Sequence, residues 1–225
     1  MWCEMAFKQI VKIWNNLNIK KTNIDFLTTK TLSVKFPFSK YDKKIIKDLK
    51  DTADRIDCAG IASNQIGHTK RIFIAYKDNA LEEYKIYINP EIIEKFEDSI
   101  VGAYYNKLDH LNRHKPNLHI YEGCLSLPKA EFSFPRFHKI KVKYFNESGI
   151  EEIEVLEKFH SQIFQHELDH LDGRTIAHRF LESLVNKTGG TMIPAEIEKY
   201  SEDDIINNFK KLESKFKLLE NYLNK

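Results

Sequence analysis

The sequence predicts an α+β fold, because helical and strand patterns occupy separate stretches of one chain. Apolar residues recur every three or four positions over 41–56 and 205–223, and they alternate with polar residues over 139–145. The chain has 225 residues, of which 42% are hydrophobic and 30% are charged. This length and balance suit one sizeable core beneath a charged surface. We therefore expect a single domain with additions.

The first 21 residues, which read MWCEMAFKQIVKIWNNLNIKK, space lysines and apolar residues roughly as a helix does. We interpret this segment as a helix that packs on the domain. A targeting segment is the alternative, which Glu4, the lack of arginine and the lack of a small-residue cleavage site disfavour. We therefore expect a cytoplasmic protein, and an organellar one only if this segment is a targeting signal.

A helix is predicted after Ser39, because Asp42 three residues later completes the pattern of a capping box. Its apolar stripe runs from Tyr41 to Ile56, so the helix should end near Cys58.

Strand patterns follow this helix. Runs rich in β-branched and aromatic residues occupy 71–76, 84–90 and 139–145. The turn sequence Asn-Glu-Ser-Gly at 146–149 then leads into 150–155. Two strands joined by such a turn predict a β-hairpin.

Two further helices are predicted. The first spans about 156–171 and places Phe159, Ile163, His166 and His170 on one face. The second begins after a capping Ser201, and it needs a partner surface because a solitary helix this polar is only marginally stable. We rank the protein's own body first and a second copy, through a coiled-coil seam, second. The apolar stripe of this helix consists of Ile205, Phe209, Leu212, Phe216, Leu219 and Leu223.

Charge and cysteine content exclude several classes of protein. A formal net charge of +2 is too small to favour nucleic acid as the main partner. The chain has no run of about eighteen apolar residues, so we expect no membrane span. Three widely spaced cysteines argue against a disulfide framework and for a reducing compartment, where a thiolate can act as ligand or nucleophile.

The sequence QHELDHLDG at 165–173 indicates a metal site. On a helix, His166 and His170 share one face and can bind one metal, with Glu167 beside them. Catalytic sites of this kind usually have three protein ligands and an open position for water. Position 176 is Ile, so the third histidine of the metzincin pattern is missing. The candidates for the third ligand are Glu182 or Glu196 downstream and, as the better one, Cys124 upstream.

Three separate sequence motifs resemble those of a known family. GIASNQ at 60–65, EGCLSLP at 122–128 and QHELDHLDG resemble the three motifs of the peptide deformylase family and stand in the same order. FPR at 134–136 sits where that family has a comparable segment. The resemblance covers about residues 27–180. It implies short antiparallel sheets around a central helix that carries HELDH, here with an extra C-terminal helix.

The resemblance implies a metal-dependent hydrolase that removes the N-formyl group from the N-terminal formyl-methionine of nascent polypeptides. It assigns the metal to Cys124, His166 and His170, and general acid–base catalysis to Glu167. It implies Fe²⁺ in cells, with Zn²⁺, Ni²⁺ or Co²⁺ able to substitute. The other implied residues are the oxyanion-hole donors, Gln65 and the Leu125 backbone N–H, and the substrate-binding set Gly60, Ile61, Gly123, Glu131, Phe159, Gln162 and Ile163.

The chain departs from the family pattern at four positions around the site. Cys58 stands for the first glycine of the glycine-rich stretch, Ser63 for an alanine, and Glu131 for an arginine found in many members. Gln162 occupies a usually apolar position that lines the pocket for the methionine side chain. We therefore expect a weaker preference for methionine than is usual in the family.

Residues 91–121 form an insertion longer than the family suggests. It contains His110, His114 and His119, which we interpret as surface histidines, with a lid over the active site as the alternative. The predicted organisation is therefore an N-terminal extension over 1–26, the deformylase-like domain over 27–180 with this insertion, and a C-terminal helical extension over 181–225.

Two other functions stay open at this point. One is hydrolysis of a different N-acyl amide, and the other is a non-catalytic module that holds peptide ends, which would not need Glu167. The predicted partner is an N-formylated peptide, with no membrane and a monomer or homodimer. Because C-terminal extensions of deformylases can contact the ribosome, a ribosome contact through the C-terminal helix is our third choice for that surface.

Overall fold

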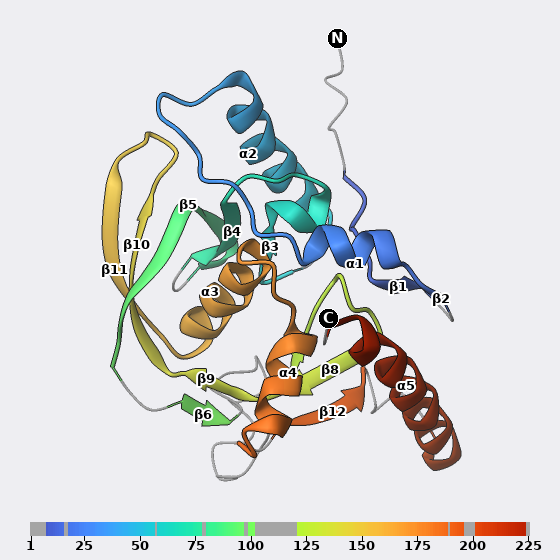
Figure 1. Ribbon diagram of the computed structural model, residues 1–225. Helices are drawn as coiled ribbons and strands as arrows, with labels where there is room; N and C mark the ends of the chain where they lie inside the picture. The colour runs from blue at the N-terminus through green and yellow to red at the C-terminus, as the bar shows by residue number, and fades with distance from the viewer. Residues whose placement is uncertain are drawn as a thin grey trace.

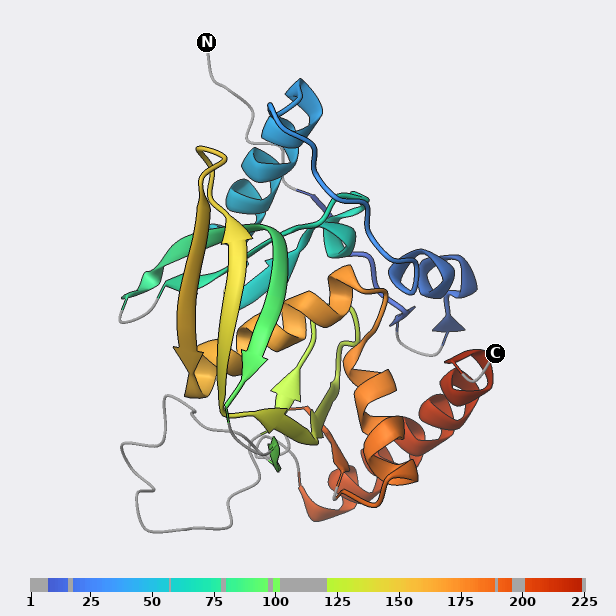
Figure 2. The same ribbon diagram turned by 60° about the vertical axis from the view of Figure 1, so that its left-hand side comes forward.

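The computed structural model describes residues 8–15, 18–56, 58–77, 80–96, 99–101, 121–188, 190–195 and 201–223. A curved antiparallel sheet wraps around one central helix, while smaller sheets and further helices lie beyond one end of that helix (Figures 1 and 2). The predicted α+β class is confirmed.

The main sheet has five strands in the order β11-β10-β5-β4-β3, each antiparallel to its neighbours. The predicted hairpin is confirmed as β10 and β11, and its turn closes with a hydrogen bond from the Gly149 N–H to the Asn146 carbonyl (2.9 Å). Gly149 has a φ of +74°, which glycine adopts without strain. The strands are β3 (Gly60–Ala62), β4 (Ile72–Lys77), β5 (Ala80–Lys95), β10 (Lys139–Phe145) and β11 (Glu151–Glu157).

Helices cover both faces of this sheet. The motif helix is confirmed as α3 (Lys158–Leu171), which lies in the concave face, where the Phe164 ring meets the Phe73 ring edge-on at 5.2 Å. Helix α2 (Lys40–Ala53) packs on the other face in an apolar cluster that includes Ile74. Because successive strand residues point to opposite faces, β4 supplies Phe73 to one cluster and Ile74 to the other.

The predicted capping box at the start of α2 is confirmed. The Asp42 N–H donates to Ser39 Oγ at 3.1 Å, and the Ser39 N–H donates back to Asp42 Oδ2 at 2.9 Å. The helix ends at Ala53, somewhat before the expected Cys58, because the chain then turns to enter β3.

Two small sheets lie beyond the main one. The strand order in the first is β12-β8-β7, and the second pairs β6 with β9. Strand β7 leads directly into Cys124, so this sheet carries the candidate third ligand toward α3. The strands are β6 (Ser99–Val101), β7 (Glu122–Gly123), β8 (Ala130–Ser133), β9 (Pro135–Phe137) and β12 (Thr191–Pro194).

The predicted N-terminal helix is wrong for the residues described. Residues 8–13 form no helix, and two short strands follow, β1 (Trp14–Asn15) and β2 (Asn18–Ile19), before helix α1 (Lys21–Leu27). The reason is tertiary. The N–H groups of Val11 and Ile13 donate to the carbonyl oxygens of Gln65 and Ser126, far along the chain, instead of closing helical turns.

The predicted C-terminal helix is confirmed as α5 (Glu202–Leu223), with the Asp204 N–H donating to the capping Ser201 hydroxyl at 3.3 Å. Docking of α5 on the protein's own body is also confirmed. Phe216 contacts Phe180 of helix α4 (Ile176–Val185) at a ring distance of 5.1 Å. The buried residues of the predicted stripe are Leu212, Phe216 and Leu219.

Replacing Leu219 by Ala should destabilise the protein by about 2–5 kcal/mol, the usual cost of a buried Leu→Ala change. Leu219 is fully buried in the cluster beneath α5, whereas its neighbour Leu218 is 55% exposed. Chemical denaturation measures the effect, with Leu218→Ala as the control, expected to fall within about 0.5 kcal/mol of wild type. Equal free energies of unfolding for the two variants would mean that α5 does not dock as the structure has it.

Several expectations fall outside the described residues. They are the surface histidines His110, His114 and His119, the lid alternative, and the candidate ligand Glu196. Of the predicted insertion, the structure describes the end of β5, strand β6 and Tyr121. Among the helices described here, none is long and apolar enough to cross a membrane.

Candidate active site

Helix α3 presents the motif residues toward one point. His166 and His170 are one turn apart, and their ring centroids lie 5.1 Å from each other. Cys124 directly follows β7, and its Sγ lies 3.2 Å from His170 Nε2. One ligand atom from each of these three residues lies within 4.8 Å of the others.

These three residues form the only group of at least three potential metal ligands within the described ranges. Glu182, the downstream alternative, is instead paired with Arg174 and Arg179. The structure therefore brings together Cys124, His166 and His170, and it places Glu182 in a different ion-pair network.

The electrostatics of the group suit a divalent cation. Burial raises the pKa of the Cys124 thiol, but His170 and His166 outweigh burial, so its pKa lies well below the usual value. The result is a thiolate between two imidazoles. Such a sulfur and nitrogen donor set, with three protein ligands, fits the open catalytic sites that zinc and similar metals form.

A buried ion-pair network orients one of these ligands. Glu122 Oε2 lies 3.0 Å from His166 Nδ1, which leaves Nε2 of that ring for the metal. Arg136 holds Glu122 with two hydrogen bonds of 2.9 and 3.0 Å, and it reaches Asp169 at 2.6 Å. Burial raises the pKa of Glu122, but Arg136 outweighs it and brings the value to about 2. Glu122 is therefore ionised and can accept the imidazole proton.

Glu167 points into the same space. Its side chain is buried, and Oε2 has no hydrogen-bond partner in the described structure. Burial raises its pKa to about 7 against the opposing effects of His166 and His170. A carboxyl group of that pKa can both accept and release a proton near neutral pH.

Gly60 allows β3 to approach Glu167 closely. A Cβ at position 60 would lie 2.8 Å from Glu167 Oε1 and 2.9 Å from Ile163 Cγ2. Real Cβ atoms do not make contacts this short, so a side chain at position 60 would displace the side chains of Glu167 and Ile163. The glycine therefore leaves room for the Glu167 carboxylate beside β3.

The short helix η1 (Ser63–Ile66) connects both halves of the site. Gln65 Nε2 lies 3.6 Å from Cys124 Sγ and 3.4 Å from Ser126 Oγ, while its Oε1 accepts the Ala62 N–H at 2.9 Å. The neighbouring Asn64 donates to the His170 carbonyl at 2.6 Å. Thus η1 contacts Cys124 through Gln65 and helix α3 through Asn64.

The predicted substrate-side residues lie on elements that border this group. Phe159, Gln162 and Ile163 belong to α3, and Gln162 is buried with no partner for its Oε1 in the described chain. Ile61 is buried on β3, and Leu125 follows Cys124. Glu131 on β8 pairs across the sheet with Gly123 on β7.

Two of the four residues that depart from the family pattern, Cys58 and Ser63, contact residues outside the metal-ligand group. Cys58 Sγ is 3.9 Å from the Tyr84 hydroxyl on β5, and the Ser63 hydroxyl donates to the Lys70 carbonyl.

Sequence reasoning assigned no role to Glu122, Asn64, Arg136 or Asp169. All four lie inside the quoted words EGCLSLP, GIASNQ, FPR and QHELDHLDG. The sequence therefore contained these charged and amide residues within its motifs, but it did not show which of them pair with one another in the fold.

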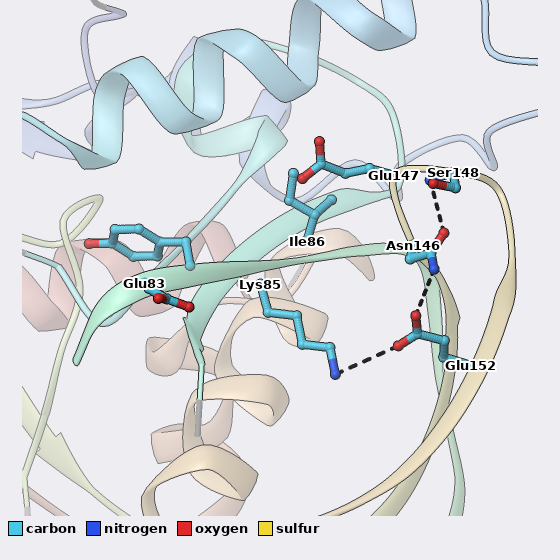
Figure 3. Close-up of a pocket in the computed structure, with 8 residues that line it drawn as sticks. Glu83, Lys85, Ile86, Asn146, Glu147, Ser148 and Glu152 are labelled. Atoms are coloured by element: carbon cyan, nitrogen blue, oxygen red, sulfur yellow. Dashed lines mark hydrogen bonds and ion pairs between the residues drawn. The ribbon is translucent and has the colours of Figure 1, made fainter. Parts of the chain in front are cut away.

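A separate pocket opens between β5 and the turn of the β10–β11 hairpin (Figure 3). Lys85 and Asn146 both approach Glu152 there, so its polar groups largely satisfy one another. None of the eight lining residues is a predicted site residue.

A helix-borne His-Glu-x-x-His pair facing a thiolate in this α+β fold defines a class, the metal-dependent hydrolases. Within that class, the chain belongs to the polypeptide deformylase family, whose model matches residues 16–186. It is therefore an enzyme that depends on a metal and removes the N-formyl group from nascent peptides.

Individual relatives agree with this assignment. A peptide deformylase of Leptospira biflexa is 28% identical over 177 residues, which cover 75% of this chain and 85% of that protein. The crystal structure of peptide deformylase from Thermotoga maritima matches with a TM-score of 0.59 and 29% identity, over 77% of this chain and 97% of that one. A class I type b peptide deformylase from Acinetobacter baumannii gives a TM-score of 0.61 and 25% identity, over 77% and 99%. The predicted family, fold and activity are confirmed.

Proposed function

We propose that Cys124, His166 and His170 hold the catalytic metal of this deformylase. The observation that carries the proposal is their convergence within 4.8 Å from two elements far apart in sequence. When bound there, a divalent metal lowers the pKa of a water molecule toward about 7 and polarises the formyl carbonyl.

Glu167 is proposed as the general acid and base. Water adds to the formyl carbon, the carbon–nitrogen bond breaks, and the products are formate and a free amino terminus. Glu167 accepts a proton from the attacking water and passes it to the departing nitrogen. Its buried position and raised pKa support both transfers.

Gln65 and the Leu125 backbone N–H are proposed to stabilise the negative charge that develops on the formyl oxygen. Donors aimed at developing charge in a buried site can contribute about 100- to 1,000-fold each. The position of Gln65 Nε2 beside Cys124 Sγ supports this role, because the formyl group must lie next to the metal.

The metal is proposed to be Fe²⁺ in cells. A thiolate and two imidazoles also accept Zn²⁺, Ni²⁺ or Co²⁺, so these ions should substitute in the purified protein.

The first side chain of the substrate is proposed to contact Gln162. This residue lies one turn before His166 on α3, and its unpartnered buried Oε1 makes the pocket more polar than an aliphatic residue would. We therefore propose formyl-methionyl peptides as substrates, accepted with a relaxed preference at the first side chain. Hydrolysis of another N-acyl amide is the second candidate, because the unpartnered amide could recognise a polar group.

Replacing Gln162 by Ile should raise kcat/KM for formyl-Met peptides several-fold. An unpaired buried amide costs about 1–3 kcal/mol, which the apolar residue removes. The assay uses anaerobically purified, iron-loaded enzyme with formyl-Met, formyl-Leu and acetyl-Met peptides, and acetyl-Met turnover is the control. An unchanged or lower value for formyl-Met would show that Gln162 points elsewhere or recognises a polar group. Faster cleavage of acetyl-Met than of formyl-Met would favour the second candidate.

For the remaining features, we propose a cytoplasmic enzyme with a core over 27–180 and added segments at 1–26 and 181–225. A monomer is favoured over a homodimer, because the apolar stripe of α5 is already covered by the protein's own body. Ribosome contact remains the third choice for this helix. Its exposed residues include Lys210, Lys211 and Lys217, which could meet RNA phosphates, but also Glu213.

A further inference from the structure

The segment before β1, drawn in blue in Figure 1, donates hydrogen bonds to two parts of the active site, η1 and residues 124–128, which we call the cysteine loop. The Val11 N–H donates to the carbonyl of Gln65 at 2.7 Å, and the Ile13 N–H donates to the carbonyl of Ser126 at 2.9 Å. These donors lie upstream of residues 16–186, the range that matches the family. The segment therefore adds contacts to the site from outside the matched part of the chain.

Trp14 anchors the same segment to the cysteine loop. Its indole N–H donates to the Pro128 carbonyl at 2.7 Å, and its side chain is only 2% exposed. Ile13 is fully buried, and both side chains belong to the apolar cluster that contains Cys124 and Leu127. Val11, Ile13 and Trp14, which we call the strap, are thus held by backbone bonds, an indole bond and packing.

The strap joins η1 to the cysteine loop. The hydrogen bonds from the Gln65 side chain to the cysteine loop are long, 3.6 Å to Cys124 Sγ and 3.4 Å to Ser126 Oγ. The strap bonds are shorter and near-ideal for N–H donors. One extended segment therefore fixes the distance between η1 and the turn that follows Cys124.

We propose that the strap is a positioning element for the oxyanion-hole donors Gln65 and Leu125. This inference rests on the proposed roles of those two residues. Their donors must meet the formyl oxygen within a fraction of an ångström to act in the transition state, and a displacement of about 1 Å can cost about 100-fold in rate. Because the strap binds the backbone of Gln65 and of Ser126 next to Leu125, it sets the positions of both donors together.

A strap that only stabilised the fold would behave differently. Loosening it would lower the melting temperature, but kcat measured well below that temperature would not change. A positioning role lowers kcat with little change in KM, because the oxyanion donors act mainly in the transition state.

The test compares Val11→Pro with Lys12→Pro. Proline removes the backbone N–H and restricts φ in both variants. Only Val11 loses a strap bond, because the Lys12 N–H donates to no residue that the structure describes. The Lys12 carbonyl, which accepts from the Asn23 side chain at 2.8 Å, is retained. Trp14→Phe is the second arm; it keeps an aromatic ring but removes the indole N–H together with the volume of the five-membered ring, so kcat is measured well below the melting temperature of this variant.

We expect Val11→Pro to lower kcat for a formyl-Met peptide at least tenfold, with KM within about twofold and metal content unchanged. Trp14→Phe should lower kcat in the same direction by a smaller factor, and Lys12→Pro should match wild type. If Val11→Pro does not fold, Trp14→Phe decides the question alone. Wild-type kcat in the folded strap variants, or an equal loss in Lys12→Pro, would overturn the proposal.

Gln65→Leu, measured in parallel, separates this proposal from the one on which it rests. A loss of kcat in Gln65→Leu with wild-type kcat in the strap variants overturns the strap alone. Wild-type kcat in Gln65→Leu overturns the role of Gln65 and the strap with it.

Discussion

Replacing Glu167 by Gln will leave the metal content unchanged and lower kcat for formyl-Met peptides by about 100- to 10,000-fold, the usual contribution of a general acid or base. Glutamine keeps the shape of the side chain but cannot accept and return a proton. Glu167 is buried at the site of the two histidines, and Gly60 leaves room for its carboxylate. Elemental analysis and single-turnover kinetics separate metal binding from chemistry.

The matched control is Glu213→Gln, the same change at an exposed position on α5. This variant should retain wild-type metal content and turnover. If Glu167→Gln hydrolyses formyl peptides as fast as wild type, the assignment of this motif to proton transfer is wrong.

Cys124→Ser will weaken metal binding by more than about 100-fold. Loss of an outer partner of a metal ligand already costs about 10- to 100-fold in affinity, so loss of the ligand itself should cost more. The thiol pKa is held well below its usual value by His170 and His166, so position 124 supplies a thiolate, whereas a serine hydroxyl keeps its proton near neutral pH. Competition with a chromophoric chelator measures the affinity.

Cys58→Ser is the control for this change, because Cys58 contacts Tyr84 and is not one of the three clustered residues. It should bind metal as wild type does. Unchanged affinity in Cys124→Ser would mean that the third ligand lies elsewhere, and a downstream glutamate would become the candidate again.

Much of the fold could be predicted because local sequence and tertiary structure agree there. Helix α2 has its own capping box, the β10–β11 hairpin has strict alternation and a turn glycine, and α5 has a stripe whose buried residues are those at helical spacing. The clustering of Cys124 with the α3 histidines was expected only because three short motifs resemble those of a known family and occur in the same order.

The N-terminal segment could not be predicted in this way. Its spacing suits a helix, but Val11 and Ile13 donate to the carbonyls of Gln65 and Ser126, acceptors more than fifty residues away. The buried Arg136 network has the same character. From sequence alone, a charged residue is expected at the surface. Only the fold shows that Arg136 is buried and paired with Glu122 and Asp169.

The most direct test of the central claim is X-ray absorption at the metal edge of the zinc-loaded enzyme. Coordination by Cys124, His166 and His170 predicts one sulfur neighbour at about 2.3 Å and two imidazole nitrogens at about 2.0–2.1 Å, with the sulfur lost in Cys124→Ser. A first shell of nitrogen and oxygen alone in the wild-type enzyme would contradict this ligand set.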